Sequence, residues 1–446
     1  MTDTLFPLPE ETCQEKVQTN NKVRLEKGDR YQARMIVASL NDLLPEDHRA
    51  RIVWGMVEMM DLSKFYVRIN AIEGEAGRPA IDPRMLIAVW LYATLEGVGK
   101  ARELARLCEE HIAYRWLMGD IRVNYHSLAD FRVDYEYELD ELLTKGVAAL
   151  MKEGIVKLER TAQDGMRVRA SAGAGSFKKR SKLEENLEQA RAQIQHLKQQ
   201  DKEDTTNTPQ KQAAQERAAR EREGRLMKAL EELDKIEAKR AKSNKKSQRQ
   251  KVSRCSSTDA EARFLKMPAG ETRPGFNAEL CIDTESRIIV GVDVIDTVDQ
   301  SQMDPMLEEL HARYGQYPDE HLVDGGFVTN SDMEAAYEKK VTVYAPLPKP
   351  RQKGLDPTKP LKRDGPGIRE WRERMTTDTA KQIYKLRAAT IEWANALSRN
   401  RGFQQMVVRG IHKVRSVLLW FALAHNLLQT QNLLTYAPSS LGGSAR

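Results

Sequence analysis

Apolar residues recur every three or four positions along the first third of the chain, which is the spacing of one face of an α-helix. We predict four amphipathic helices here, at 49–60, 82–97, 101–117 and 127–152. Glycine and proline separate them, and Asp82 before Pro83 is typical of a helix start, with an N-cap acid and proline in the first turn. The pattern therefore predicts an N-terminal helical domain.

A short link through Gly119 and 125–127 joins two of these helices. Such an arrangement can present a helix to a DNA groove. The cations nearby are candidate phosphate contacts: Arg115, Arg122, Arg132 and Lys145. A helical bundle without any DNA role has the same pattern, so the DNA interpretation depends on the neighbouring domain.

From residue 156 the period changes to that of a strand. Apolar and polar residues alternate on both sides of Asp164, and strand patterns return at 273–282 and 287–294 with a hairpin turn between them. Further elements are predicted in this order: a helix at 302–314, a short strand ending at Asp324, a helix at 331–339 and a strand at 341–347. Ser331 as N-cap and Glu334 at the third helical position form a capping-box pattern.

Two further helices follow a loop rich in Pro, Lys and Gly at 348–368. In the first, Tyr384, Glu392 and Arg399 lie about two turns apart and share one face. The last helix, about 411–433, is apolar on most sides, and we expect it to pack against the sheet.

Residues 178–250 differ in composition, because they are rich in Lys, Arg, Glu, Gln and Ala and contain no aromatic residue. Apolar positions step by four and three, as in the seam of a coiled coil: Leu183, Leu187, Ala190, Ile194 and Leu197. The segment 204–209 interrupts the pattern, which predicts an antiparallel coiled-coil hairpin inserted into the following domain. Its basic end, 242–254, is either a DNA contact or, as charge runs usually are, a solvated face.

The order of three strands, helix, strand, helix, strand and helix is that of an RNase H-like sheet. We therefore predict a mixed α+β and α/β chain, with a helical N-terminal domain and an RNase H-like five-stranded mixed sheet that carries the coiled-coil hairpin. The predicted parts are an N-terminal arm at 1–45, a helical DNA-binding domain at 46–155, an RNase H-like catalytic domain at 156–177 and 255–436, the insertion at 178–254, and a disordered tail at 437–446.

Composition changes this picture little. The net charge of +6 and pI ≈ 8.9 suit a protein that meets phosphate backbones, although many cytosolic proteins are equally basic. The four cysteines form no C-x-x-C pair, which favours reduced thiols over disulfides or a zinc site. No apolar run approaches the roughly 20 residues that cross a bilayer, and no signal peptide opens the chain. We expect a cytoplasmic protein without membrane contact.

Three acids fall at related places in this fold: Asp164 on the first strand, Asp324 just past the fourth, and Glu392 on the helix after the fifth. Clustered carboxylates repel one another and raise one another's pKa, so such a cluster is stable chiefly as a cation site. Each residue alone has a simpler interpretation, as a turn aspartate or a surface glutamate. Their joint placement favours a metal site, whereas other acids such as Asp259 and Glu261 are interpreted as structural.

The helix near the C-terminal end carries a family signature. Tyr384, Arg387, Glu392 and Arg399, followed by Arg401, resemble the Tyr/Arg/Glu/basic motif of the DDE transposases of bacterial insertion sequences, within the RNase H and retroviral-integrase superfamily. Two further matches concern other blocks of the family: Asp164-Gly165 and 324–327 resemble its aspartate blocks, and 44–48 and 125–132 its helical N-terminal domain. Four residues, rather than the commonest three, separate Arg387 from Glu392, and Arg399 stands where Lys is common.

This resemblance implies a transposase that cuts DNA at the terminal inverted repeats of an insertion sequence and joins the 3′-OH ends to target DNA. Two Mg²⁺ or Mn²⁺ ions would be held by Asp164, Asp324 and Glu392. The phosphate-binding residues implied are Tyr384, Arg387, Arg399 and Arg401.

The implied partners are double-stranded DNA and a second copy of the chain, as a homodimer assembled on that DNA near the bacterial nucleoid. Two alternatives stay open. One is a catalytically inactive, transposase-derived DNA-binding protein, and the other is a plain RNase H-like nuclease.

Overall fold

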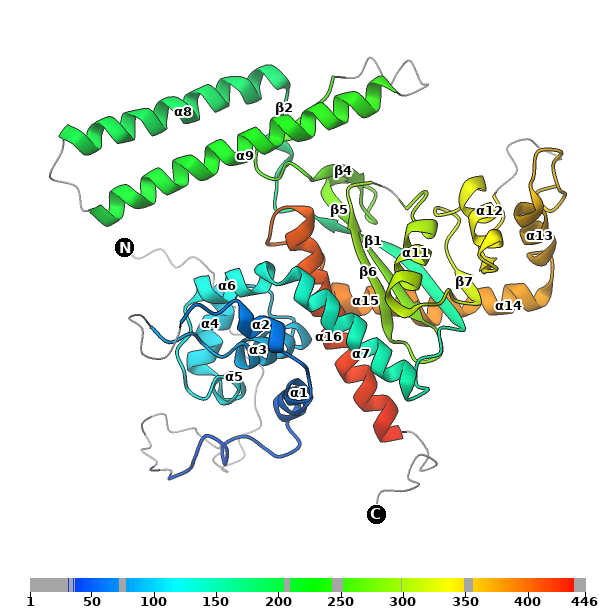
Figure 1. The fold of residues 1–446 in the computed structure, drawn as a ribbon, viewed down its shortest axis with the longest axis horizontal. Coiled ribbons are helices and arrows are strands. Elements are labelled where there is room, and N and C mark those ends of the chain that lie inside the picture. Colours follow the sequence, from blue (N-terminus) through cyan, green and yellow to red (C-terminus); the bar gives the residue numbers. More distant parts are fainter. Residues whose placement is uncertain are drawn as a thin grey trace, which may run out of the picture. The chain divides into compact units, whose positions relative to one another are not determined.

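The computed structural model describes residues 31, 35, 37–71, 78–203, 209–242, 252–297, 299–348 and 356–436. They form a mixed α/β structure with N-terminal helices, a mixed sheet and a long helix pair (Figure 1). Most of the predicted arm, the predicted tail and most of the basic run at 242–254 lie outside the described residues. Within these ranges no helix combines the length and apolar character that crossing a membrane requires.

Seven helices make up the described N-terminal region: α1 (Arg49–Glu58), α2 (Ser63–Val67), α3 (Pro83–Leu95), α4 (Ala101–Glu110), α5 (Ile112–Leu117), α6 (Tyr125–Asp134) and α7 (Glu136–Lys152). The predicted start of α3 is confirmed, because the Asp82 carboxylate accepts the Arg84 backbone N–H at 2.8 Å. The predicted helix 101–117 is in fact two helices. His111 is extended between them, and its Nδ1 accepts the Ala113 N–H to begin α5.

The sheet combines antiparallel and parallel pairing. Its main strands are β1 (Arg160–Arg169), β5 (Thr272–Asp283), β6 (Ile289–Ile295), β7 (Glu320–Leu322) and β8 (Thr342–Tyr344). The order across these five is β6-β5-β1-β7-β8, with β6, β5 and β1 antiparallel and β1, β7 and β8 parallel. The five predicted strands are thus confirmed, and a further short strand, β4 (Arg263–Lys266), pairs with the first residues of β5.

The remaining helices are α11 (Met303–Tyr314), α12 (Asn330–Glu338), α13 (Pro366–Arg374), α14 (Asp378–Arg387), α15 (Trp393–Asn400) and α16 (Ile411–Tyr436), with a π-helical segment, Ala388–Glu392, between α14 and α15. Helix α13 was not predicted, because its sequence adjoins a loop rich in Pro, Lys and Gly.

The predicted capping box at Ser331 and Glu334 is wrong. The hydroxyl of Thr329 caps α12 instead, by accepting the Asp332 N–H at 3.1 Å. The Glu334 carboxylate accepts the N–H groups at 367 and 368, at 3.1 and 3.0 Å, and so satisfies the first turn of α13. The local pattern assigned Glu334 to the N-terminus of its own helix, but its carboxylate instead contacts the N-terminus of α13.

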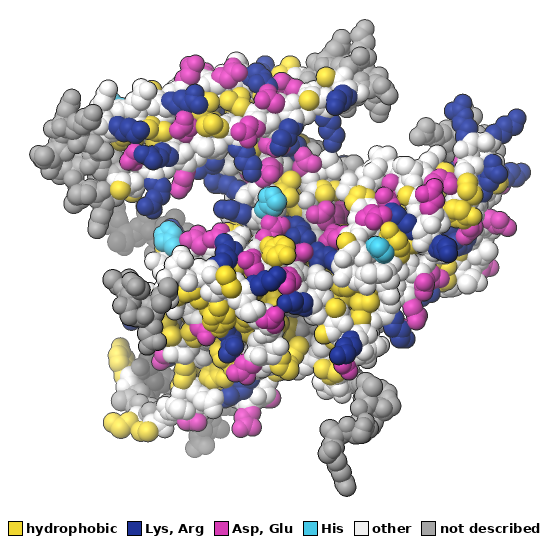
Figure 2. Space-filling model, viewed as in Figure 1, with side chains coloured by type: hydrophobic (Ala, Val, Ile, Leu, Met, Phe, Trp, Pro, Cys, Tyr) yellow, Lys and Arg dark blue, Asp and Glu magenta, His cyan; other side chains and the backbone are white. Residues whose placement is uncertain are grey.

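The inserted segment forms two long helices, α8 (Arg180–Glu203) and α9 (Pro209–Ala241), which lie side by side (Figure 1). Ion pairs show that they are antiparallel, since Arg180 meets Asp234 while Arg191 meets Glu223. The predicted seam is buried at Leu183 and Leu187. Lys and Arg side chains alternate with Asp and Glu over the outer surface of the pair (Figure 2), which is typical of a solvated face.

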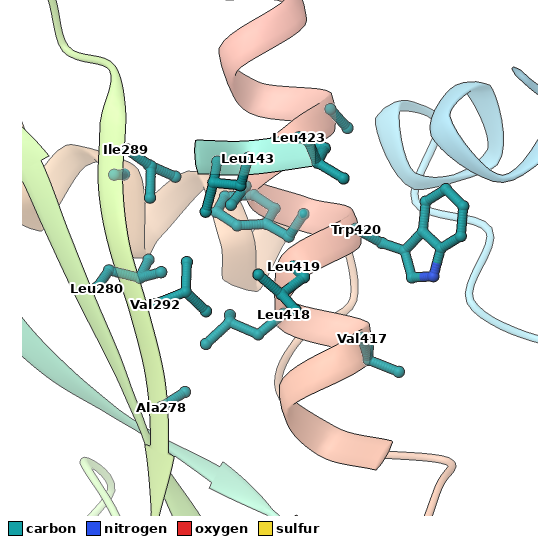
Figure 3. Packing of buried hydrophobic residues seen from close by; sticks show 14 of the residues in the cluster. Leu143, Ala278, Leu280, Ile289, Val292, Val417, Leu418, Leu419, Trp420 and Leu423 are labelled. Carbon is teal, nitrogen blue, oxygen red and sulfur yellow. The ribbon is translucent and has the colours of Figure 1, made fainter. Parts of the chain in front are cut away.

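Helix α16 is the centre of the core. Leu418 and Leu419 lie on the side where the sheet contributes Leu280 and Val292, whereas Trp420 points away from the sheet (Figure 3). The Trp420 ring lies 6.5 Å from that of Trp90 on α3, and its Nε1 donates to the Arg132 carbonyl at 3.0 Å. The helix therefore packs against the sheet, as predicted, and also against the N-terminal helices.

Two acids hold the beginning of α16. The Asp259 carboxylate accepts the Gly410 N–H at 3.1 Å, and the Glu261 carboxylate accepts the Ile411 N–H at 3.0 Å. Negative charge at a helix N-terminus is stabilising, so the predicted structural role of both acids is confirmed.

The face of the sheet that meets α11 carries a buried polar network. It runs through Thr161, His321, Gln163, Glu279, Asn277 and Asp299. His321 contacts Thr161 at 2.8 Å, and Gln163 donates to Glu279 at 3.1 Å. Burial lowers the pKa of His321 to about 3 and raises the pKa of Glu279 well above its usual value, so both neutral forms are favoured.

Truncation of Leu418 tests the central position of α16. We expect Leu418→Ala to lower the free energy of unfolding by about 2–5 kcal/mol, because it leaves a cavity beneath the sheet. Leu434→Ala on the exposed end of the same helix is the control, with an expected change within about 0.5 kcal/mol. Urea unfolding followed by tryptophan fluorescence measures both, and equal losses would contradict this packing.

His321 makes stability depend on pH. Its folded-state pKa lies below the usual 6.5, so between about 6.5 and 3 the unfolded chain binds a proton that the folded chain does not. Stability is therefore lost as the pH falls through this window. As the pH falls through this window, we expect the unfolding free energy of wild type to decrease relative to that of His321→Gln by about 1.4 kcal/mol per pH unit. Parallel profiles of unfolding free energy against pH for the two proteins would refute this. His196→Gln on α8 provides the control.

Candidate active site

The pairing of β1 with β7 places two of the predicted acids side by side. These strands are parallel, and their last paired residues are Ala162 and Leu322. Asp164 and Asp324 each follow two residues later, so they lie level at the same edge of the sheet. The register thus explains how aspartates 160 residues apart in the chain share one site.

Arg387 joins the first of these acids to the third. Its Nη2 lies 2.7 Å from Asp164 Oδ1, and its Nη1 lies 2.8 Å from Glu392 Oε1. The guanidinium is largely buried, whereas about half of the Glu392 side chain is exposed. One cation therefore neutralises two carboxylates that come from the sheet and from the helix that crosses it.

The π-helical segment explains the unusual spacing between Arg387 and Glu392. In an α-helix, residues five apart do not share a face. A π turn makes i→i+5 hydrogen bonds and takes in one extra residue. Because 388–392 is π-helical, Arg387 and Glu392 meet in spite of the additional residue between them.

The surroundings of Asp164 raise its pKa. Burial raises its pKa to about 6, with smaller increases from the charges of Asp324 and Asp299, while Arg387 and a hydrogen bond from Asn395 oppose the shift. Asn395 Nδ2 donates to Asp164 Oδ2 at 2.8 Å. Asn395 lies three residues after Glu392, so helical spacing was the signal that could have identified it.

Asp299 is a fourth acid at this site, and the sequence interpretation missed it. It lies between β6 and α11, where no periodic pattern drew attention to it. A Cβ on Gly165 would lie 2.2 Å from Asp299 Oδ1, and a Cβ on Gly326 would lie 3.5 Å from Oδ2. Gly165, which follows Asp164, therefore leaves room for this carboxylate, to which Asn277 donates at 2.6 Å.

The other predicted residues divide between two places. Tyr384 lies with the acids: burial raises its pKa, and so do the charges of Asp324 and Glu392, while Arg387 opposes the shift. Arg399 is exposed, seven residues after Glu392 on α15. Arg401 lies elsewhere, with its guanidinium 5.9 Å from the Phe421 ring and its backbone beside Gly97.

The predicted phosphate contacts in the N-terminal helices have varied surroundings. Arg115 is paired with Asp120 at 2.8 Å, and Lys145 with Asp61 at 2.9 Å. Arg122 is exposed, and Arg132 is buried. Two of the four charges are thus already neutralised by carboxylates.

The described residues include no group of three His, Cys, Asp or Glu side chains arranged to hold a metal ion. The chemistry of the donors nevertheless fits Mg²⁺, because carboxylate oxygens are its preferred ligands. In the structure Arg387 supplies the positive charge between Asp164 and Glu392. A divalent cation at these two acids has to compete with that guanidinium.

Comparison with known families gives two matches. Residues 38–134 match a transposase domain (DUF772), and residues 367–430 match a transposase DDE domain. The second match contains Glu392, whereas Asp164 and Asp324 lie outside it. No curated protein and no solved structure matches the chain.

A DDE domain implies transposase activity and DNA binding, and transposases with this domain generally use divalent metals. The two matched regions are the N-terminal helices and the helices around the acid site. Residues 38–134 and 367–430 are thus similar to two domains of the transposase family.

Proposed function

We propose that this transposase cuts DNA at the terminal inverted repeats of an insertion sequence and joins the resulting 3′-OH ends to target DNA. The observation that supports this proposal is the contact of Arg387 with both Asp164 and Glu392, beside a strand register that brings Asp324 level with Asp164. The strand order β6-β5-β1-β7-β8 supports an RNase H-like assignment of the sheet, in which the carboxyl ends of parallel strands bear the site.

Asp164, Asp324 and Glu392 would hold two Mg²⁺ or Mn²⁺ ions, and such ions stabilise the attacking and leaving oxygens of an in-line phosphoryl transfer. To bind a cation, Asp164 has to be ionised. Its pKa of about 6 means that it is ionised at neutral pH and protonated in mild acid. Asn395 holds one Asp164 oxygen and so orients the carboxylate.

The chain's own basic and hydroxyl groups would position the substrate. Arg387 contacts both Asp164 and Glu392. With a metal ion bound to these acids, the guanidinium N–H groups of Arg387 would be available to donate to a phosphate beside them. Tyr384 lies with the same charged groups and offers a hydroxyl. Exposed Arg399 would contact DNA further along the helix.

The proposed partners are duplex DNA, both terminal repeat and target, and a second copy of the chain in a homodimer assembled on that DNA. We also propose the domain boundaries predicted above and a location at the bacterial nucleoid. A transposase-derived protein without catalysis, or a nuclease that hydrolyses without joining, would give different products from the same DNA.

Asp164→Asn tests the proposed chemistry. We expect cleavage and joining of a duplex carrying the element's terminal repeat, with Mg²⁺ present, to fall by on the order of 100-fold or more, because the variant lacks a carboxylate charge that would hold the metal ions. Binding of the same duplex should be retained. Asp293→Asn, which alters another partly buried acid, on β6, is the control. Cleavage by Asp164→Asn at the wild-type rate would refute the assignment, and hydrolysis without joining by the wild type would favour a nuclease.

Arg387→Gln separates the two roles proposed for this arginine. Loss of the guanidinium leaves two carboxylates without their cation, so we expect Mn²⁺ affinity measured by calorimetry to rise about tenfold. DNA cleavage should fall in the same variant, because the phosphate contact is lost. If Mn²⁺ affinity is unchanged, Arg387 does not compete with the metal.

A further inference from the structure

A cavity of about 510 Å³ lies away from the acid site, between the two regions that match transposase domains. One wall comes from the end of α3 and the turn into α4, with Arg132 of α6. The other wall comes from 401–407, between α15 and α16, and from Val417. The charged lining residues are Lys100, Glu103, Arg132 and Arg401.

The two walls approach each other closely through glycines. Gly97 has φ +75° and Gly402 has φ +89°, in the left-handed region that favours glycine. A Cβ on Gly402 would lie 3.6 Å from the Gly97 carbonyl oxygen, and one on Gly97 would lie 3.7 Å from the Arg401 Cα. The backbone of the N-terminal helices thus meets the backbone of the DDE region at the cavity.

Arg132 is a buried cation without a carboxylate. Its side chain lines the cavity although the residue is only 6% exposed, and its guanidinium lies 4.7 Å from the Trp90 ring centroid. Nη1 donates to the Gly99 carbonyl at 2.5 Å, and Nε has no hydrogen-bond partner. No acid within the described ranges forms an ion pair with it, and burial lowers its pKa to about 10. An unpaired buried charge is costly, and an anion beside Arg132 would reduce that cost.

Arg401 and the N-terminus of α4 add further uncompensated positive charge to the cavity. Arg401 Nη1 is buried without a hydrogen-bond partner. Burial also lowers the pKa of Arg401, with a smaller decrease from the nearby charge of Arg49, while Glu96 opposes the shift. No side chain caps the N-terminus of α4 at Lys100, and the positive end of a helix dipole favours an anion. The one acid in the lining, Glu103, is exposed.

We propose that this cavity binds one phosphate of the DNA backbone, through Arg132, Arg401 and Lys100. Arginine and lysine together with backbone N–H groups are the usual ligands of DNA phosphates. The inference deepens the proposed function, because it adds a DNA contact remote from the reacting phosphate. It also assigns Arg401 to this second site rather than to the acid site.

The site is tied to the strand that carries Asp164. The Arg169 N–H donates to the Gln404 carbonyl at 3.0 Å, and the Met406 N–H donates to the Arg169 carbonyl at 2.8 Å. Arg169 ends β1, five residues after Asp164. A phosphate held by the 401–407 wall is therefore positioned relative to the sheet as well as to the N-terminal helices.

Arg401→Gln and Lys100→Gln in the full-length chain test the proposal. The measurement is the affinity for a mixed-sequence duplex DNA by fluorescence anisotropy, over a series of NaCl concentrations. We expect affinity to fall about tenfold and the slope of log K against log [NaCl] to decrease by about one unit, since one phosphate contact is lost. Arg106→Gln is the matched control, because it removes an exposed cation of α4 that pairs with Glu110 outside the cavity lining.

A further variant, Arg132→Lys, keeps the positive charge but removes the planar guanidinium. Thermal unfolding establishes whether each variant is folded. Inorganic phosphate is the second probe, and it should raise the unfolding temperature of wild type but not of Arg401→Gln. An unchanged salt slope in folded Arg401→Gln overturns the proposal. Stabilisation by inorganic phosphate with an unchanged slope also overturns it, because the cavity then takes free phosphate.

These measurements need no cleavage. If the variants lose the DNA contact while Asp164→Asn leaves cleavage intact, the phosphate site stands and the proposed catalytic site does not.

Discussion

The burial of α16 on two opposite sides is the constraint on which the rest of this structure depends. A helix that is apolar nearly all round has to be covered on every side. Here the sheet covers one side through Leu280 and Val292, and the N-terminal helices cover the other, where Trp420 meets Trp90. The same hydrophobic surface thus holds the two transposase regions together. The turn before α16 necessarily lies at their junction.

Electrostatics organises the acid site. Asp164 is partly buried, and removing a carboxylate from water without a counter-charge is unfavourable. Arg387 supplies that charge and reaches Glu392 as well, through a π turn that brings the two residues into line. An arginine between two acids keeps them close without a metal. A metal ion that binds these acids has to displace Arg387, at the cost of the free energy of its two ion pairs.

The two basic centres of the molecule differ in what surrounds them. At the acid site Arg387 pairs with two carboxylates, which balance its charge within the chain, although its Nε has no hydrogen-bond partner. At the cavity between the transposase regions, Arg132 has a tryptophan face and one backbone carbonyl, and Arg401 has a phenylalanine face. Aromatic rings reduce the cost of burying a cation but do not neutralise it. The unmet charge at this junction is what an external phosphate would satisfy.

The sequence by itself determined the elements, because helical and strand periods are local properties of consecutive side chains. The five main strands, the α8–α9 pair and the apolar last helix could be predicted in this way. The N-terminal helices were predicted in part, since α2 was missed and the predicted helices 101–117 and 127–152 are each two helices. The family signature at Tyr384 and Glu392 was equally visible, since its residues lie on one helix. The roles of Asp164, Asp324 and Glu392 remain predictions from that signature and from the order of the strands.

Tertiary structure decided what depends on contacts between distant residues. Strand register made the two aspartates level, and packing placed Asp299 beside Gly165. Thr329 caps α12, and the Glu334 carboxylate accepts hydrogen bonds from the start of α13. Arg132 became a buried cation only through the helices around it. No periodic pattern in the sequence predicts these outcomes, because each depends on contacts between segments that meet only in the folded chain.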